Sequence, residues 1–280
     1  MTQTTSEILR EKGFFFPVRK EDLFDNKGNL AYIKAVVNAD TDAHLGYVSA
    51  KYAPMTNEDA FSFLDEIDLK LLKYGLRKGG SRSFVIGELS EVTVLGDCHK
   101  LHVVVENSFD GSTPYRASFC MLRIVCENQL AQVFRGGQGN VRLFHTPSIY
   151  AKAETAHELM AGASRYVAEY VDAAEKLASK KLADYEMIDL IRNYFAQAKV
   201  AKTEKAIQKQ QEEAEKVISL LRADDHANFQ GTAWQVINAM TNYYSHLEPS
   251  KKTKEEASQR RYFQNMDRDF SEFATALLAA

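Results

Sequence analysis

The chain is poor in cysteine, and its few cysteines follow no metal-binding or redox spacing. Only Cys98, Cys120 and Cys126 occur in 280 residues, and no two of them form a C-x-x-C pair. An odd number of unpatterned cysteines argues against a disulfide framework and against a zinc knuckle. We therefore expect no metal site, and thiols that stay reduced in a cytoplasmic protein.

Long apolar runs are also missing. No stretch approaches the roughly 18 apolar residues that span a bilayer, and the first residues, MTQTTSEILREKG, contain no apolar segment behind a basic start. We expect a protein that is neither inserted into a membrane nor exported.

The common catalytic and cofactor-binding motifs are absent as well. The sequence contains no G-x-G-x-x-G, no P-loop, no H-E-x-x-H and no G-x-S-x-G string. The nearest glycine-rich loop, Arg135 to Asn140, lacks the P-loop lysine. These absences predict no cofactor, and they favour binding over catalysis.

A strong net positive charge is missing too, since the formal net charge is −3. The whole protein therefore does not suit coating of nucleic acid through bulk charge. Locally the balance differs, because residues 73–145 carry nine Lys or Arg against six Asp or Glu. Any polyanion site should lie in this segment.

The pattern of apolar residues predicts an α+β protein with two domains. Strand-like runs fill residues 1–147, whereas helical periodicity takes over in residues 148–280. We expect an antiparallel sheet with a packed helix in the first part. Ala31–Val37 and His44–Met55 should form a hairpin, and a helix capped at Thr56 or Asn57 should run to Gly75.

The second part should be helical. We expect one helix from the region of Ser148 to Leu177, and others over Tyr185–Ala198, Thr232–Leu247 and Phe270–Leu278. The run from Lys199 to Lys216 alternates in charge, which is typical of a solvated helix face.

Basic and aromatic residues supply the only candidate binding site. No acidic residue occurs between Glu127 and Glu154, where arginines alternate with aromatics. Arginines can hold phosphates while aromatic rings stack on bases, which is how single-strand binders work. The predicted contact residues are Arg77, Lys78, Arg82, Arg135, Arg142, Phe144, His145 and Tyr150.

A long motif adds a family resemblance. The segment NSFDGSTPYRASFCMLRIVCENQL, followed by His145-Thr146, resembles DUF932, a family of phage- and plasmid-related proteins with a domain of unknown function. GTAWQVINAMTNYYSH resembles the C-terminal signature of that family. The chain departs from the pattern at Phe144, where members often carry an arginine. The resemblance implies a mobile-element setting and no assigned activity.

These observations leave three hypotheses. The first is a non-enzymatic binder of single-stranded nucleic acid, in annealing or a related process, with a homo-oligomer left open. The second is a protein-interaction module, such as a host-defence antagonist, that uses the charged helix. The third is an enzyme with a site around Asp110, Arg123 and His145. For these residues, turn and cap roles are an alternative: Asn107 and Asp110 bonding their own backbone, and Asn128 capping a helix.

Overall fold

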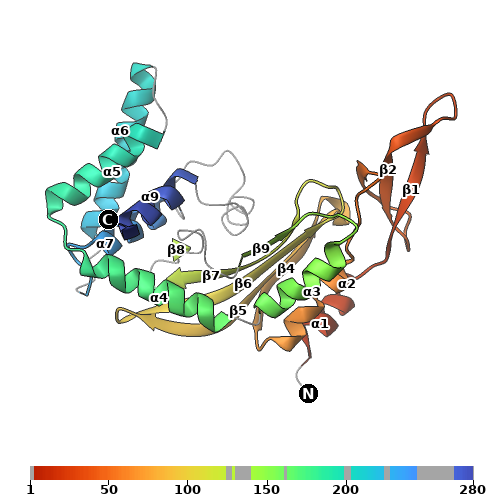
Figure 1. Ribbon diagram of the computed structural model, residues 1–280, viewed down its shortest axis with the longest axis horizontal. Coiled ribbons are helices and arrows are strands. Elements are labelled where there is room, and N and C mark those ends of the chain that lie inside the picture. Colours follow the sequence, from red (N-terminus) through yellow and green to blue (C-terminus); the bar gives the residue numbers. More distant parts are fainter. Residues whose placement is uncertain are drawn as a thin grey trace. The chain divides into compact units, whose positions relative to one another are not determined.

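The computed structural model describes residues 3–123, 128–129, 140–160, 163–198, 203–223, 228–244 and 268–279. Antiparallel strands dominate the first half and helices the second (Figure 1), so the predicted α+β class is confirmed. The chain forms two compact units. Unit 1 comprises Met1–Ser90, His102–Phe119 and Gln138–Ala163, and unit 2 comprises Glu91–Leu101, Cys120–Gly137 and Ser164–Ala280.

A three-stranded antiparallel sheet, here termed the β-arm, is the first sheet of unit 1. It consists of β1 (Val18–Phe24), β2 (Leu30–Asn38) and β3 (His44–Ser49) in that order. The predicted hairpin of β2 and β3 is confirmed, with Ala35 opposite Tyr47. Strand β1 was not predicted, because its sequence VRKEDLF carries four consecutive charged residues and little apolar alternation.

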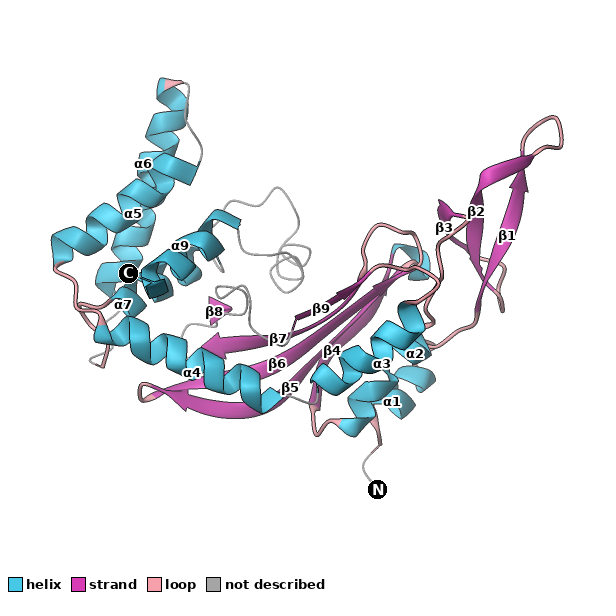
Figure 2. Ribbon diagram, in the orientation of Figure 1, coloured by secondary structure: helices cyan, strands magenta, loops and turns pink. Residues whose placement is uncertain are grey.

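A larger sheet follows, with the strand order β4-β5-β6-β7-β8 and with β9 paired to β7 (Figure 2). Its long strands are β4 (Lys70–Arg77), β5 (Arg82–Val94), β6 (Asp97–Ser108) and β7 (Tyr115–Arg123). The short ones are β8 (Asn128–Gln129) and β9 (Asn140–Leu143). Phe109 to Pro114 connect β6 to β7, which are neighbours in this sheet.

The helix predicted from Thr56 to Gly75 is largely wrong. Thr56 does cap α2 (Asn57–Phe61), and the 3₁₀ helix η1 (Ser62–Glu66) follows, but the chain then enters β4. Pairing with β5 overrides the helical periodicity. A Cβ on Gly75 would meet the Phe84 ring at 2.9 Å, so this glycine permits close packing between strands and is no helix cap.

One face of the large sheet packs against helices. Asn57 of α2 accepts a hydrogen bond from Ser83 and donates one to Phe14 O, and Tyr115 donates to Ala60 O. Helices α1 (Thr5–Glu11) and α3 (Ile149–Met160) belong to the same unit. Fully buried aromatics, including Phe14, Phe61 and Tyr115, form this core.

The β-arm joins the rest of unit 1 through a tight apolar contact. Val36, Leu45 and Val48 of the arm pack with Phe109. A Cβ on Gly46 would lie 2.5 Å from the Cα of Asp110, so only glycine allows this approach of the two backbones. The arm is therefore anchored at the loop that connects β6 to β7.

Unit 2 is built on helices. They are α4 (Ala163–Ser179), α5 (Asp184–Ala198), α6 (Glu204–Ala223), α7 (Ala233–Asn242) and α9 (Arg268–Ala279). The predicted helices over 185–198, 232–247 and 270–278 are confirmed within one turn over the residues that the structure describes. The first predicted helix corresponds to α3 and α4, and residues 161 and 162 between them lie outside the described residues.

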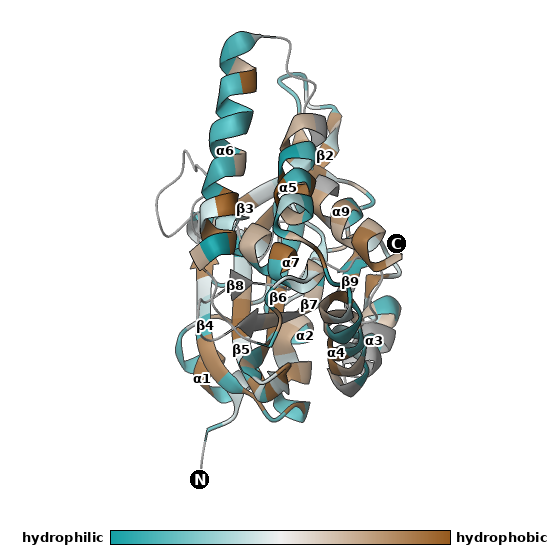
Figure 3. Ribbon diagram, turned by 90° about the vertical axis from the view of Figure 1, so that its left-hand side faces the viewer, coloured by the Kyte–Doolittle hydropathy of each residue, from teal (hydrophilic) through white to brown (hydrophobic). Residues whose placement is uncertain are grey.

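The charged run is amphipathic where it is described. Helix α6 is mainly hydrophilic in Figure 3, yet it buries Ala214, Val217, Ile218 and Leu221 at helical spacing. The predicted solvated face is therefore confirmed for α6. Among the described helices, none combines the length and the apolar character that crossing a membrane requires.

Candidate functional site

The strand register collects arginines on one face of the large sheet. Arg77 on β4 lies opposite Arg82 on β5, and Arg116 on β7 lies opposite Arg142 on β9. Residues directly opposite each other in an antiparallel pair point to the same side. Each pair of strands thus brings two guanidinium groups together.

Arg82 and Arg116 point away from α2. Ser83 and Tyr115 bond residues of the helical layer, and they are the neighbours of Arg82 and Arg116 along the strands. Because adjacent strand residues point to opposite faces, Arg82 and Arg116 occupy the face without α2. Here the arginine cluster means Arg77, Lys78, Arg82, Arg116 and Arg142.

Glu106 is the buried counter-charge of this cluster. Its side chain is 5% exposed, and burial raises its pKa against the opposing charges of Arg116, Arg77 and Arg82. Its Oε2 atom has no hydrogen-bond partner among the described residues. Burial and the charge of Arg142 lower the pKa of Arg116, and the opposite charge of Glu106 only partly offsets this. Glu106 is thus a buried carboxyl group under the influence of three arginine charges.

Asp110 is the second carboxylate at the cluster. Its Oδ2 lies 3.2 Å from Arg82 Nε and 4.0 Å from Lys78 Nζ. Partial burial raises its pKa, but hydrogen bonds from Ser112 and the charge of Arg82 outweigh this and lower it. Asp110 therefore stays ionised. Five cations face two carboxylates, which leaves an excess of positive charge.

Exposed groups lie beside the cluster. The Arg142 guanidinium lies 5.2 Å from the centre of the Phe144 ring, and Phe144 is 64% exposed. Lys78 is 61% exposed. Tyr150 is exposed at its ring, but its hydroxyl donates to Pro54 O at 2.9 Å. Phe144 and Arg142 together present a cation and an aromatic face to solvent, the pair of groups that binds a nucleotide.

His145 has a structural place. It is buried, its ring stacks on Tyr52 at 4.8 Å, and its Nε2 donates to Asn107 Oδ1 at 3.0 Å. Burial lowers its pKa to about 4, so the ring is neutral near pH 7. Asn107 also donates to Met55 O and Asn57 Oδ1. We leave His145 out of the proposed site because it is enclosed in this network.

The enzyme hypothesis concerns Asp110, Arg123 and His145, and the structure describes the side chains of Asp110 and His145. His145 bonds Asn107, whereas Asp110 bonds Arg82 and Ser112, and the two share no hydrogen bond. The side chain of Arg123 and all of Arg135 lie outside the described residues. Over the part of the chain that the structure describes, no group of three or more His, Cys, Asp or Glu could hold a metal ion.

The predicted turn roles are partly right. Asp110 Oδ1 accepts the backbone N–H of Ser112, as a turn residue does. Asn107, however, bonds other segments of unit 1, and Asn128 lies in β8 and caps no helix. Sequence reasoning also missed Arg116 and Glu106 as members of the site. The sequence offered one signal for them: Glu106 and Arg116 lie on the two strands that flank the β6–β7 loop.

A groove lies in unit 2. A groove of about 580 Å³ between α5 and α6 is lined by Arg192, Phe195, Ile207, Gln211 and Glu215, among others. Arg192 and Glu215 form an ion pair of 2.8 Å in this groove. Its lining combines apolar and paired charged groups, without an excess of cations.

Comparison with known proteins gives one match. The model of the domain of unknown function DUF932 matches residues 44–265, which is well over half of the chain. No curated protein and no solved structure matches the chain significantly. The matched region includes β3, the arginine cluster and α4 to α7. The chain therefore belongs to the DUF932 family of unknown function.

Proposed function

We propose that this protein binds single-stranded nucleic acid without catalysing a reaction, and that the arginine cluster holds the phosphates. The observation that carries the proposal is the meeting of cations from β4, β5, β7 and β9 at one sheet face, with Phe144 exposed beside them. Phosphate contacts give affinity, and an exposed ring beside them stacks on bases of any sequence.

The exposure of each cationic side chain decides which of them contacts the nucleic acid directly. Lys78 and Arg142 are exposed and reach a backbone directly. Arg82 is 25% exposed and already paired with Asp110, so it contributes mainly to the positive field. Arg77 lies over the Phe84 ring, 4.3 Å from its centre, and is held in place by that contact.

A salt titration tests the proposal. Binding of a labelled oligo-dT should weaken linearly in a plot of log affinity against log salt. Lys78→Ala and Arg142→Ala should each reduce the slope by about 0.7, the value for one phosphate contact on a single strand. Lys176→Ala is the matched control, because Lys176 is 61% exposed on α4, and it should leave the slope unchanged.

The aromatic contact has its own test. Phe144→Ala should weaken binding to single strands by about 1–3 kcal/mol, the usual value of one stacked base. It should leave binding to duplex DNA unchanged, because paired bases cannot stack on the ring. Absence of oligo-dT binding at low salt, or equal effects of Phe144→Ala on both substrates, would falsify the proposed mode.

We further propose a cytoplasmic protein of a phage, prophage or plasmid. The support is the motif resemblance described above together with the free thiol of Cys98. The neighbourhood of the coding sequence tests the setting. Flanking genes for replication, recombination or mobility support it, and a conserved place among housekeeping genes contradicts it.

The groove between α5 and α6 supports a second candidate function, capture of another protein. Ile207 lies in this groove and is 45% exposed. Ile207→Asp should abolish capture of such a partner and leave oligonucleotide binding intact. Loss of oligonucleotide binding in this variant would contradict a separate protein site.

A further inference from the structure

Glu106 on β6 lies on the same face of the large sheet as the arginine cluster. Its neighbour Asn107 donates hydrogen bonds to Met55 O and to Asn57 Oδ1 of α2. Because adjacent residues of a strand point to opposite faces, Glu106 points away from α2. The side chain is nevertheless 5% exposed, so its carboxyl group has lost most of its contact with water.

Charged groups act on Glu106 from the strands and the loop around it. Arg77 lies on β4, Arg82 on β5 and Arg116 on β7, and Asp110 lies in the loop that follows β6. The three arginines favour the ionised carboxylate, whereas the like charge of Asp110 disfavours it.

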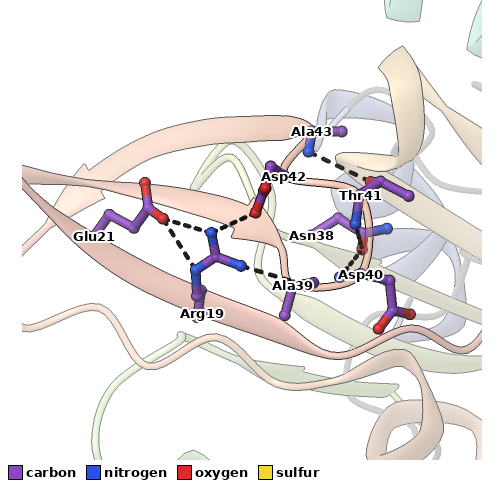
Figure 4. Close-up of polar contacts among 8 residues, drawn as sticks. All are labelled: Arg19, Glu21, Asn38, Ala39, Asp40, Thr41, Asp42 and Ala43. Carbon is purple, nitrogen blue, oxygen red and sulfur yellow. Dashed lines mark hydrogen bonds and ion pairs between the residues drawn. The ribbon is translucent and has the colours of Figure 1, made fainter.

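A carboxylate beside an arginine is usually held by direct hydrogen bonds, as on the β-arm. Figure 4 shows Arg19 donating to Glu21 Oε1, at 3.0 Å from Nε and at 2.7 Å from Nη2, and to Asp42 Oδ1 at 2.6 Å. Glu106 differs, because its Oε2 has no hydrogen-bond partner among the described residues. Charged hydrogen bonds are what compensates a buried carboxylate for lost hydration. Burial therefore prevails over the arginine charges and raises the pKa of Glu106.

A strand bound at the arginine cluster would shift the protonation of Glu106 further. Its phosphates bring negative charge to the cations that favour the ionised form, and like charge disfavours a carboxylate. The strand also keeps water from the sheet face, which acts in the same direction. Both effects should raise the pKa of Glu106 in the complex. Because coupling between two ligands is reciprocal, a proton on Glu106 must strengthen strand binding by the same factor.

We propose that the arginine cluster binds a single strand together with a proton, and that Glu106 accepts this proton. The proposal rests on the proposed function and adds a regulation to it. Affinity is highest below the pKa that Glu106 has in the free protein. It falls as the pH rises through the pKa that Glu106 has in the complex, because the strand must then bind beside an ionised carboxylate.

The size of the coupling follows from the charge that the proton removes. One partly screened charge should change the affinity about threefold, which equals a rise of about half a pKa unit on binding. Proton uptake is then partial. At the pH midway between the two pKa values, about 0.3 proton should enter each site when the strand binds.

Isothermal titration calorimetry with the full chain and oligo-dT measures this uptake directly. Thymine bases do not titrate near neutral pH, so they contribute no protons. At each pH the titration is repeated in two buffers with different enthalpies of protonation, and the difference in heat gives the number of protons taken up. The series stays above about pH 5, where His145, with a pKa of about 4, is mainly neutral. The wild type should take up protons, and Glu106→Gln should take up none.

Two control variants separate this role from a general effect of charge. Asp110 stays ionised, because hydrogen bonds from Ser112 and the charge of Arg82 lower its pKa. Asp110→Asn should therefore keep the uptake but move it to lower pH, since a like charge near Glu106 is lost. Glu169 is exposed on α4, and Glu169→Gln should keep both the affinity and the uptake of the wild type.

Three results would overturn the inference. Equal heats in both buffers at every pH, or an unchanged uptake in Glu106→Gln, would remove proton coupling while leaving strand binding in place. Absence of oligo-dT binding at low salt would remove the proposed function together with this inference. If Glu106→Gln unfolds at a lower temperature, the wild-type heats and the pH shift in Asp110→Asn still decide the question.

Discussion

The β-arm and the arginine cluster belong to the same compact unit, yet they differ in how far their cations are paired with carboxylates. On the arm, Arg19 meets two carboxylates and Lys34 meets one, while large apolar rings stay exposed. On the sheet, three arginines act on Glu106, and Arg82 and Lys78 lie near Asp110. Net charge of the whole chain hides this contrast. The two regions therefore differ in charge: cations of the arm are paired with carboxylates, whereas the sheet face carries more cations than carboxylates.

The two regions depend on one junction, which contains Tyr52, His145, Gly46 and Asp110. Tyr52 stacks on His145 and bonds Ser108 O, and Gly46 touches Asp110. Substitutions at this junction should change the stability of the fold without changing the exposed residues of the arm or of the arginine cluster.

Acid should have the largest effect on the junction. His145 has a pKa of about 4 in the folded chain, below the ordinary value of 6.5, because burial disfavours its charge. The unfolded chain therefore binds more protons below pH 6.5, and stability is complete above that pH and falls as the pH drops toward 4. The loss by pH 4 should be about 3 kcal/mol.

Urea unfolding at several pH values measures this loss. His145→Gln should remove that part of the pH dependence, and His44→Gln, on the exposed edge strand β3, serves as the control. Equal pH profiles for the wild type and His145→Gln would contradict the assignment.

Gly46→Ala should break the contact between arm and sheet. The new Cβ would approach the Cα of Asp110 to 2.5 Å, and relief of such overpacking costs about 2–3 kcal/mol. The free energy of unfolding from urea titration measures it. Ser49→Ala, at an exposed position on the same strand, should change stability by less than about 0.5 kcal/mol. Equal stability of the two variants would show that the backbones can separate freely.

Tyr52→Phe should have a smaller effect on stability. It deletes the hydroxyl that donates to Ser108 O at 2.6 Å and keeps the stack on His145. The expected loss is about 1 kcal/mol, the net value of one hydrogen bond. Thermal unfolding measures it, and oligo-dT binding should be unaffected. A tenfold loss of that binding would mean that Tyr52 belongs to the nucleic-acid site.

Glu106→Gln should slightly increase the net positive charge of the arginine cluster. It removes the carboxylate on which the charges of Arg116, Arg77 and Arg82 act. Oligo-dT affinity at neutral pH should rise about threefold, the effect of one partly screened charge. Because burial raises the pKa of Glu106, wild-type affinity should approach that of the variant as the pH falls. A parallel pH dependence in both proteins would contradict this role.

Local patterns predicted the helices better than the site. Thr56 and Thr232 signal helix starts through side-chain caps, and both are caps. The run Lys70–Arg77 misled because its leucines fit helical and strand spacing alike, and only pairing with β5 decides between them. Strand β1 carries too few apolar residues to be recognised, and it exists because β2 supplies its partner.

The candidate site residues were only partly predictable, because strand pairing again cannot be seen in the local sequence. Arg77, Lys78, Arg82 and Arg142 are visible as basic residues, but the register that unites them is a property of the sheet. His145 shows the opposite error. Its neighbours Arg142 and Phe144 are exposed, and nothing in the sequence shows that His145 turns inward to Asn107.

The hydrogen bonds of Asn107 also decide where the chain can be cut. This amide joins three separate stretches of the chain, because Asn107 bonds Met55 and Asn57 in one stretch and His145 in another. A fragment that ends after β7 retains Asn107 but not the imidazole that saturates its oxygen. Any shortened version made for crystallisation or for NMR should therefore extend past residue 145, and past Tyr150 if its bond to Pro54 is to be kept.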